Sequence, residues 1–184
     1  MREINGLFID IGNSLGLPLF PFSASSFAVA ENRHLVHGDV SSIELALKKG
    51  FIPVVYGDVV TDKKQGVSIA STEMIFEFLS SKLKPSKIIL GTDVDGVFNK
   101  NPTLSKDAKL IPIVGKNNLN YVLHGSTGSI HVDVSGGMKT KITMLYRMVK
   151  NTGATGYIIN ANKPGNISKI LKGEKAKYTL IKQS

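Results

Sequence analysis

Three short, dense apolar runs constrain this chain more than any other feature of its sequence. They occupy residues 51–56, 87–91 and 156–160, and each of them leads into a polar or glycine-containing segment. Runs of this length are typical of strands buried on both faces. Because amphipathic segments of helical spacing alternate with them, the pattern predicts an α/β fold, a three-layer αβα sandwich around a mainly parallel central sheet.

The segments between these runs predict the remaining elements. Apolar side chains three and four residues apart indicate helices over residues 3–15 and 138–149, and serines at 41–42 and 71 are candidate helix N-caps. Residues 62–66 have the composition of an exposed turn at the tip of a hairpin. Residues 23–33 are expected to form a polar connection.

Composition and charge limit the classes of protein to which this chain can belong. The chain has no cysteine and no apolar run of membrane-spanning length, and its first residues do not have the pattern of a secretory signal. A cytoplasmic protein is therefore expected. Residues 139–184 carry ten lysine and arginine side chains against Glu174 alone, and they account for the whole net charge of +9. This local excess favours an anionic ligand; interleaved aromatic residues of a nucleic-acid surface are missing, so no nucleic-acid partner is expected.

The first candidate site is the segment 91–97, Gly-Thr-Asp-Val-Asp-Gly-Val, directly after the second apolar run. Ligands of open α/β sheets bind beyond the carboxyl ends of strands. Two carboxylates and a hydroxyl suit a ribose or Mg²⁺, and the glycines allow a tight turn. The alternative is a local turn in which Asp93 and Asp95 accept hydrogen bonds from nearby amides.

The second candidate site is the segment 133–141, which leads into the long helix. Adjacent glycines and free amides at a helix start form an anion site, and Lys139 and Lys141 add positive charge. Lysines there oppose the helix dipole unless an anion lies between them, which favours phosphate over the alternative of a solvated pair. The spacing differs from that of a Walker A loop.

The third candidate site combines Gly57 and Asp58, after the first apolar run, with Thr72 and Glu73 at a predicted helix start. The alternative for Glu73 is simple complementarity to the helix dipole. The four histidines lack the spacing of metal ligands, and no arranged serine, histidine and aspartate set indicates a hydrolase.

Three motifs, in order and spacing, resemble the amino acid kinase superfamily, and within it most closely the archaeal isopentenyl phosphate kinases. They are residues 53–59 (PVVYGDV), residues 91–98 (GTDVDGVF) with Asn101 and Pro102, and residues 133–138 (DVSGGM) with Lys141. The resemblance implies phosphoryl transfer from ATP, bound as its Mg²⁺ complex, to a small phosphorylated substrate, isopentenyl phosphate. It also implies one domain, with residues 1–84 on the acceptor side and residues 85–184 as the nucleotide-binding half.

The resemblance assigns roles residue by residue. It implies Lys141 and Glu73 as catalytic groups, and Gly57, Asp58 and Thr72 as substrate contacts. The residues that it places against the nucleotide are Thr92, Asp93, Asp95, Gly96, Val97, Pro102, Gly136, Gly137, Met138 and Lys141.

The sequence departs from the family pattern in two places. Residues 71–74 read Ser-Thr-Glu-Met where the family has Ser-Gly-Asp-Asp, and the 184 residues contain neither the Lys-x-Gly-Gly-Ser strand nor the glycine-rich histidine loop. We therefore expect impaired kinase activity from this polypeptide alone. The alternative is a nucleotide-binding module without catalysis. Exposed apolar surface is expected to favour a homo-oligomer, through the helix at 3–15, or a complementing chain.

Overall fold

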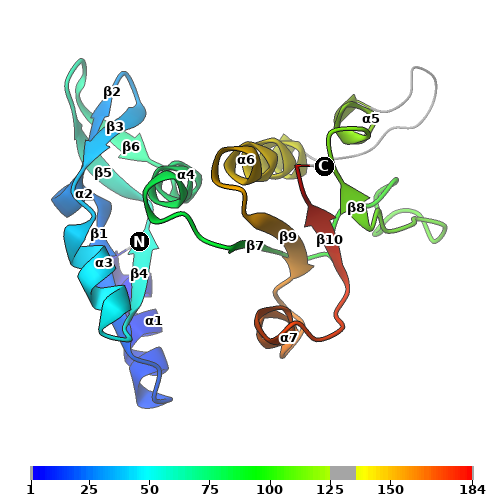
Figure 1. Ribbon diagram of the computed structural model, residues 1–184, viewed down its shortest axis with the longest axis horizontal. Helices are drawn as coiled ribbons and strands as arrows, with labels where there is room; N and C mark the ends of the chain where they lie inside the picture. Colours follow the sequence, from blue (N-terminus) through cyan, green and yellow to red (C-terminus); the bar gives the residue numbers. More distant parts are fainter. Residues whose placement is uncertain (1, 125–135, 184) are drawn as a thin grey trace. The chain divides into compact units, whose positions relative to one another are not determined.

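The computed structural model describes residues 2–124 and 136–183, and it separates the chain into two compact units, Met1–Leu83 and Lys84–Ser184 (Figure 1). We call them the N-terminal and the C-terminal unit and describe each by itself. Their assignment to an acceptor side and a nucleotide-binding half remains a prediction.

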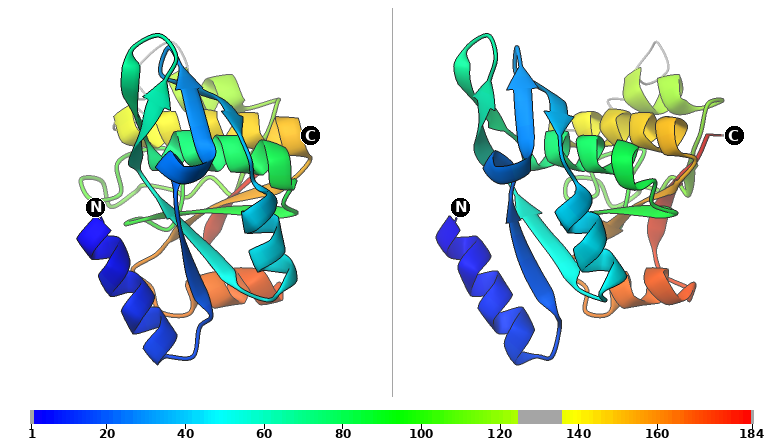
Figure 2. Two further views of the ribbon diagram at one scale, coloured as in Figure 1. Left: turned by 90° about the vertical axis from the view of Figure 1, so that its left-hand side faces the viewer. Right: turned by 60° about the vertical axis from the view of Figure 1, so that its left-hand side comes forward.

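The N-terminal unit contains two sheets. Its helices are α1 (Arg2–Ser14), α2 (Ala24–Phe27), α3 (Ser41–Lys48) and α4 (Thr72–Leu83), and its strands are β1 (Leu19–Ser23), β2 (Ala28–Glu31), β3 (His34–Gly38), β4 (Ile52–Tyr56), β5 (Asp58–Asp62) and β6 (Gly66–Ala70). Strands β1 and β4 form a parallel pair flanked by α1 and α3 (Figure 2), and the other four follow the order β3-β2-β5-β6. Small side chains let α2 and α4 pack closely on this second sheet; its core is Ala24, Ala30, Val60, Ala70 and Ile75.

Three local expectations for this unit need correction. Residues 23–33 are not simply a polar connection, because residues 24–31 form α2 and β2. Helix α3 has no side-chain cap from its serines; instead, the carboxylate of Asp39 accepts a hydrogen bond from the Ser41 N–H at 2.9 Å. The hairpin β5–β6 turns at the expected place, but Asp62 is buried. Its carboxylate accepts backbone N–H groups from two turns, so the chain closes around it.

The C-terminal unit has one mixed sheet with helices on both faces. Its strands are β7 (Lys87–Thr92), β8 (Ile113–Val114), β9 (Thr155–Asn160) and β10 (Tyr178–Ile181), and its helices are α5 (Leu119–His124), α6 (Gly136–Thr152) and α7 (Asn166–Lys172). The order is β7-β9-β10-β8, in which only the pair β9–β10 is antiparallel. Helices α6 and α7 cover opposite faces (Figure 1).

Close packing of α6 on the sheet makes the core of this unit. Ile142, Leu145 and Met148 are fully buried along one face of α6, as their spacing predicts. Gly156 allows the approach, because a Cβ there would lie 2.9 Å from Leu145 Cγ. Parallel pairs outnumber antiparallel ones over both units, and the expected α/β class with a mainly parallel sheet is confirmed.

Candidate functional site

A pocket of about 160 Å³ lies in the C-terminal unit where strand β7 ends. Its lining consists of Asp93, Val94, Gly96, Val97, Phe98, Lys100, Asn101, Pro102, Thr103 and Met138. Apolar side chains with one carboxylate, one ammonium and several hydrogen-bonding groups are the usual composition of a small-molecule site. The first and second sequence motifs thus meet at this pocket, through Asp93, Val94, Gly96 and Val97 of the loop and Met138 of α6.

The loop after β7 is a tight turn held by its neighbour β9. The hydroxyl of Thr92 donates to the Val94 carbonyl at 2.8 Å, and the side-chain amide of Asn160 donates to the Asp93 carbonyl at 3.0 Å. Ala161 N–H donates to the Thr92 carbonyl at 2.8 Å. The Thr92 hydroxyl therefore contacts both the turn and, through the Ile159 carbonyl at 3.1 Å, strand β9, while the Asp93 side chain is exposed at the pocket.

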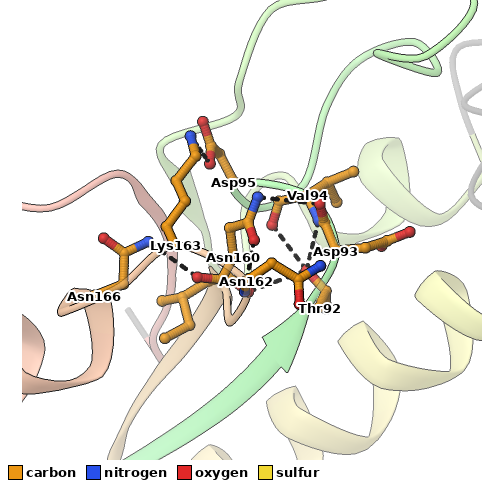
Figure 3. Close-up of polar contacts among 9 residues, drawn as sticks. Thr92, Asp93, Val94, Asp95, Asn160, Asn162, Lys163 and Asn166 are labelled. Atoms are coloured by element: carbon orange, nitrogen blue, oxygen red, sulfur yellow. Dashed lines mark hydrogen bonds and ion pairs between the residues drawn. The ribbon is translucent and has the colours of Figure 1, made fainter.

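Asp95 is not among the lining residues, although it stands between two that are. Its carboxylate forms an ion pair with Lys163 in the loop between β9 and α7 (Figure 3). The Asp95 side chain is 16% exposed, and its Oδ1 atom, which faces the ammonium, has no solvent contact.

Gly96 and Val97 are held from the other side by the last strand. Thr179 of β10 is fully buried; its hydroxyl accepts the Val97 N–H and donates to the Ile111 carbonyl, both at 2.7 Å. Gly96 has φ +149°, and a Cβ there would lie 2.5 Å from the Thr179 hydroxyl oxygen. Glycine is required at this position both by its backbone conformation and by the close approach.

Residues 100–103 line the pocket and belong to the segment 99–109, which is closed by its own polar contacts. Lys109 N–H donates to the Asn99 side chain at 2.7 Å, and the Lys100 ammonium bonds the Asp107 carboxylate. Hydrogen bonds from Lys100 and from the Ser105 hydroxyl lower the pKa of Asp107 to about 2. Asp107 thus stays ionised at neutral pH and keeps Lys100 beside the pocket.

The start of α6 supplies the remaining predicted nucleotide residues. Gly136 and Gly137 are its first two residues, Met138 lines the pocket, and Lys141 follows one turn later, partly buried and outside the lining. Residues 133–135 of this motif lie outside the described residues.

The third candidate site lies in the N-terminal unit. Gly57 and Thr72 are neighbours, because a Cβ on Gly57 would lie 3.6 Å from the Thr72 hydroxyl oxygen. The Asp58 carboxylate accepts hydrogen bonds from the Ser25 hydroxyl at 2.6 Å and the Ser25 N–H at 3.1 Å. Glu73 is exposed in the first turn of α4, which the Ser71 hydroxyl caps as expected.

Sequence reasoning missed several residues that build the pocket. Lys100 lines it directly, whereas Asn160, Lys163 and Thr179 fix its loop from other elements. The position of residues 160–163 after a buried strand, at the same edge of the sheet as the first motif, was the signal that could have identified them.

Among the described residues, no three histidine, cysteine or acidic side chains are grouped in a way that could hold a metal ion. None of the described helices is both long enough and apolar enough to cross a membrane.

Comparison with known proteins then decides the family. The model of the amino acid kinase family matches residues 2–160. The chain belongs to this family. Isopentenyl phosphate kinase from Methanothermobacter thermautotrophicus is 36% identical to this chain over 183 residues. The match covers 98% of the chain and 67% of the relative. The enzyme of the same name from Methanocaldococcus jannaschii is 36% identical over 174 residues, 95% of the chain and 62% of the relative.

A solved structure supports the same family. The chain matches one described as an isopentenyl phosphate kinase with a TM-score of 0.78 and 34% identity, covering 98% of this chain and 66% of that one. The chain therefore spans roughly two thirds of the length of these relatives.

Proposed function

We propose that the pocket at the end of β7 binds ATP and that the chain serves in phosphoryl transfer from ATP to isopentenyl phosphate. The observation that carries the proposal is the meeting of the loop 92–97 and the start of α6 at one pocket of the C-terminal unit. Family membership and the relatives named isopentenyl phosphate kinase support the reaction and its acceptor.

The lining suits the parts of a nucleotide. The side chains of Phe98, Pro102 and Met138 offer apolar surface to the base. The volume of about 160 Å³ is smaller than the roughly 300–1,000 Å³ of pockets that enclose a whole drug-sized ligand, so we assign the pocket to the base and ribose alone. The phosphates would then extend toward the α6 N-terminus, where the helix dipole and Lys141 provide positive charge. Phosphoryl transfer depends mainly on such positioning and charge neutralisation.

Asp93 is the residue that fits Mg²⁺. Its carboxylate is exposed at the pocket, and Mg²⁺ in nucleotide sites commonly uses one or two carboxylates together with substrate phosphates. The ion would arrive with ATP and offset the charge of the phosphates.

Calorimetric titration with ATP tests the site. Replacing Lys141 by methionine should weaken ATP binding by about 10- to 150-fold, because a charge-assisted contact to phosphate contributes about 1.5–3 kcal/mol. Lys150→Met, an exposed lysine in the last turn of the same helix, is the matched control and should bind as the wild type does. A wild-type chain that binds neither ATP nor ADP would contradict the proposal.

The second candidate function is nucleotide binding without catalysis. Thr72 and Glu73 replace the glycine and aspartate of the family pattern, and the 184 residues contain no Lys-x-Gly-Gly-Ser sequence. We expect this polypeptide to bind ATP and to phosphorylate isopentenyl phosphate slowly or not at all. Turnover at ordinary enzyme rates would exclude this second candidate.

A further inference from the structure

The end of β9 and the loop between β9 and α7 make two side-chain contacts with the loop after β7 that the proposed reaction does not explain. The first is the side-chain amide of Asn160, which fixes the Asp93 carbonyl at 3.0 Å. The second is the ion pair between Lys163 and Asp95 (Figure 3). Strands β7 and β9 are parallel neighbours, with Thr92 opposite Asn160, so both loops leave the same edge of the sheet.

The two side chains of this ion pair differ in their exposure to solvent. Asp95 is 16% exposed and Lys163 is 50% exposed, so the carboxylate is the enclosed member and the ammonium covers it from the solvent side. An enclosed carboxylate without its cation is unfavourable, and the loop would have to move to hydrate it. Lys163 therefore keeps Asp95 in place.

Holding Asp95 fixes its neighbours in the chain. Val94 and Gly96 line the pocket on either side of Asp95, whose own side chain is turned to Lys163. A rotation that released Asp95 toward water would displace the pocket wall on both sides.

The loop that carries Lys163 is itself anchored. Asn162 N–H donates to the Asn160 side-chain oxygen at 2.9 Å, and the Asn166 side chain donates to the Asn160 carbonyl at 3.0 Å. The side chain of Asn160 thus bonds both turns: its oxygen accepts from the turn that carries Lys163, and its amide donates to the turn after β7. These hydrogen bonds hold the backbone on either side of Lys163 in place.

We propose that Lys163 is a positioning residue of the nucleotide pocket, which it shapes by holding Asp95 without touching the ligand. This inference rests on the proposed nucleotide site and deepens it, because it assigns Asp95 to the anchor of the loop and leaves Asp93 as the carboxylate that faces the ligand. The effect is expected to be equal for every ligand that occupies the base-and-ribose part of the pocket.

The test uses the 184-residue chain with Lys163→Met, Lys163→Arg and the double change Asp95→Asn with Lys163→Met. Lys169→Met, which removes an exposed lysine of α7, is the matched control. Two quantities are measured: hydrogen exchange of the backbone amides of residues 93–98, and the dissociation constants of ATP and adenosine. Adenosine has no phosphate, so it separates loop position from direct phosphate contact.

Lys163→Met should speed exchange in residues 93–98 and weaken ATP and adenosine by the same factor, about fivefold, the scale of a partly exposed ion pair. Lys163→Arg should restore both, and the control should change neither. In the double variant the loss should be smaller than in Lys163→Met, since no enclosed charge is left unpaired.

Weakening of ATP alone would overturn the inference, because it would mean that Lys163 contacts the phosphates. Unchanged exchange in Lys163→Met would overturn it as well. If the wild type binds neither ligand, the nucleotide proposal itself fails. Exchange then decides the anchor alone: faster exchange in Lys163→Met supports it, and unchanged exchange overturns it.

Discussion

Asp58 in the N-terminal unit and Asp95 in the C-terminal unit both follow a strand that the sequence predicts as buried, and both are bound by a residue distant in the chain. Ser25 binds Asp58 through its hydroxyl and its N–H, and Lys163 binds Asp95 through its ammonium. The surroundings differ: Asp95 lies in a loop whose neighbours line a pocket, with side chains from β9 and β10 holding that loop. An acidic residue after a strand thus indicates first that its carboxylate holds the local backbone in place, and a ligand contact only where the adjoining backbone faces a cavity.

The largest expected effect in this comparison comes from Gly96→Ala. The added Cβ would approach Thr179 Oγ1 to 2.5 Å and the Thr179 backbone N to 2.8 Å, in a conformation that side chains rarely adopt. We expect a loss of about 4 kcal/mol in the free energy of unfolding, measured by denaturant titration, and loss of ATP binding.

Gly153→Ala is the control for Gly96→Ala. Gly153 has φ +75°, but a Cβ there would meet nothing within 4 Å. Its cost should be about 1 kcal/mol, from backbone strain alone, with ATP binding retained. Equal losses in the two variants would refute the importance of the contact with Thr179.

The next effect concerns the Thr179 hydroxyl. Thr179→Val keeps the shape of the side chain but leaves the Val97 N–H and the Ile111 carbonyl without their partner. Unfolding free energy should fall by about 2 kcal/mol, the cost of unsatisfied buried groups, and ATP affinity should fall with it. Thr179→Ser retains the hydroxyl and should preserve ATP affinity; a weaker affinity in the serine variant would assign the role to the methyl group instead.

A third prediction concerns the apolar surface of the N-terminal unit. Leu7, Phe8 and Ile11 of α1 are each more than half exposed, so we expect copies of the chain to associate through this helix. Phe8→Asp should raise the dissociation constant of the oligomer at least about tenfold in light scattering or sedimentation, because aromatic side chains dominate such interfaces. The control Asp10→Asn, on the same helix, should leave it unchanged. A monomeric wild type at high concentration would contradict the prediction.

The smallest expected effect is on acid titration, and it concerns one aspartate in each unit. Burial raises the pKa of Asp62, but backbone N–H groups of Arg33, Lys64 and Gln65 outweigh it and hold that pKa well below its usual value. The pKa of Asp107 is about 2. Carboxyl signals followed by NMR should show Asp107 and Asp62 both protonating below the usual aspartate pKa of about 4.

The sign of the pH dependence follows from these shifts. Both carboxylates have a lower pKa folded than unfolded, so their stabilisation is present above about pH 4 and is lost on acidification. For Asp107 the loss falls between about pH 4 and 2, and for Asp62 it likewise falls below about pH 4. Protonation of either carboxylate near pH 4 would contradict the role given to the groups that hydrogen-bond it.

The sequence was sufficient for features that depend on neighbours in the chain. The dense apolar runs became β4, β7 and β9, and the spacing along α6 marked the side chains that are buried. The loop after β7 was recognised because its glycines and carboxylates stand together.

Features that depend on partners distant in the chain could not be predicted from the sequence. Thr179 acts on Val97, 82 residues away, and nothing near it in the sequence marks a buried hydroxyl. Asp62 read as an exposed turn residue because its burial depends on the turn at Asn32 and Arg33, about 30 residues earlier. The roles of Lys141 and Glu73 in catalysis stay predictions.

Strand β10 contributes no side chain to the lining of the pocket, yet through Thr179 it holds the backbone of Val97, which does line it. The wall of the pocket is therefore completed by a strand whose side chains do not line it. Variants that weaken β10 would disturb the pocket while leaving every residue that lines it unchanged.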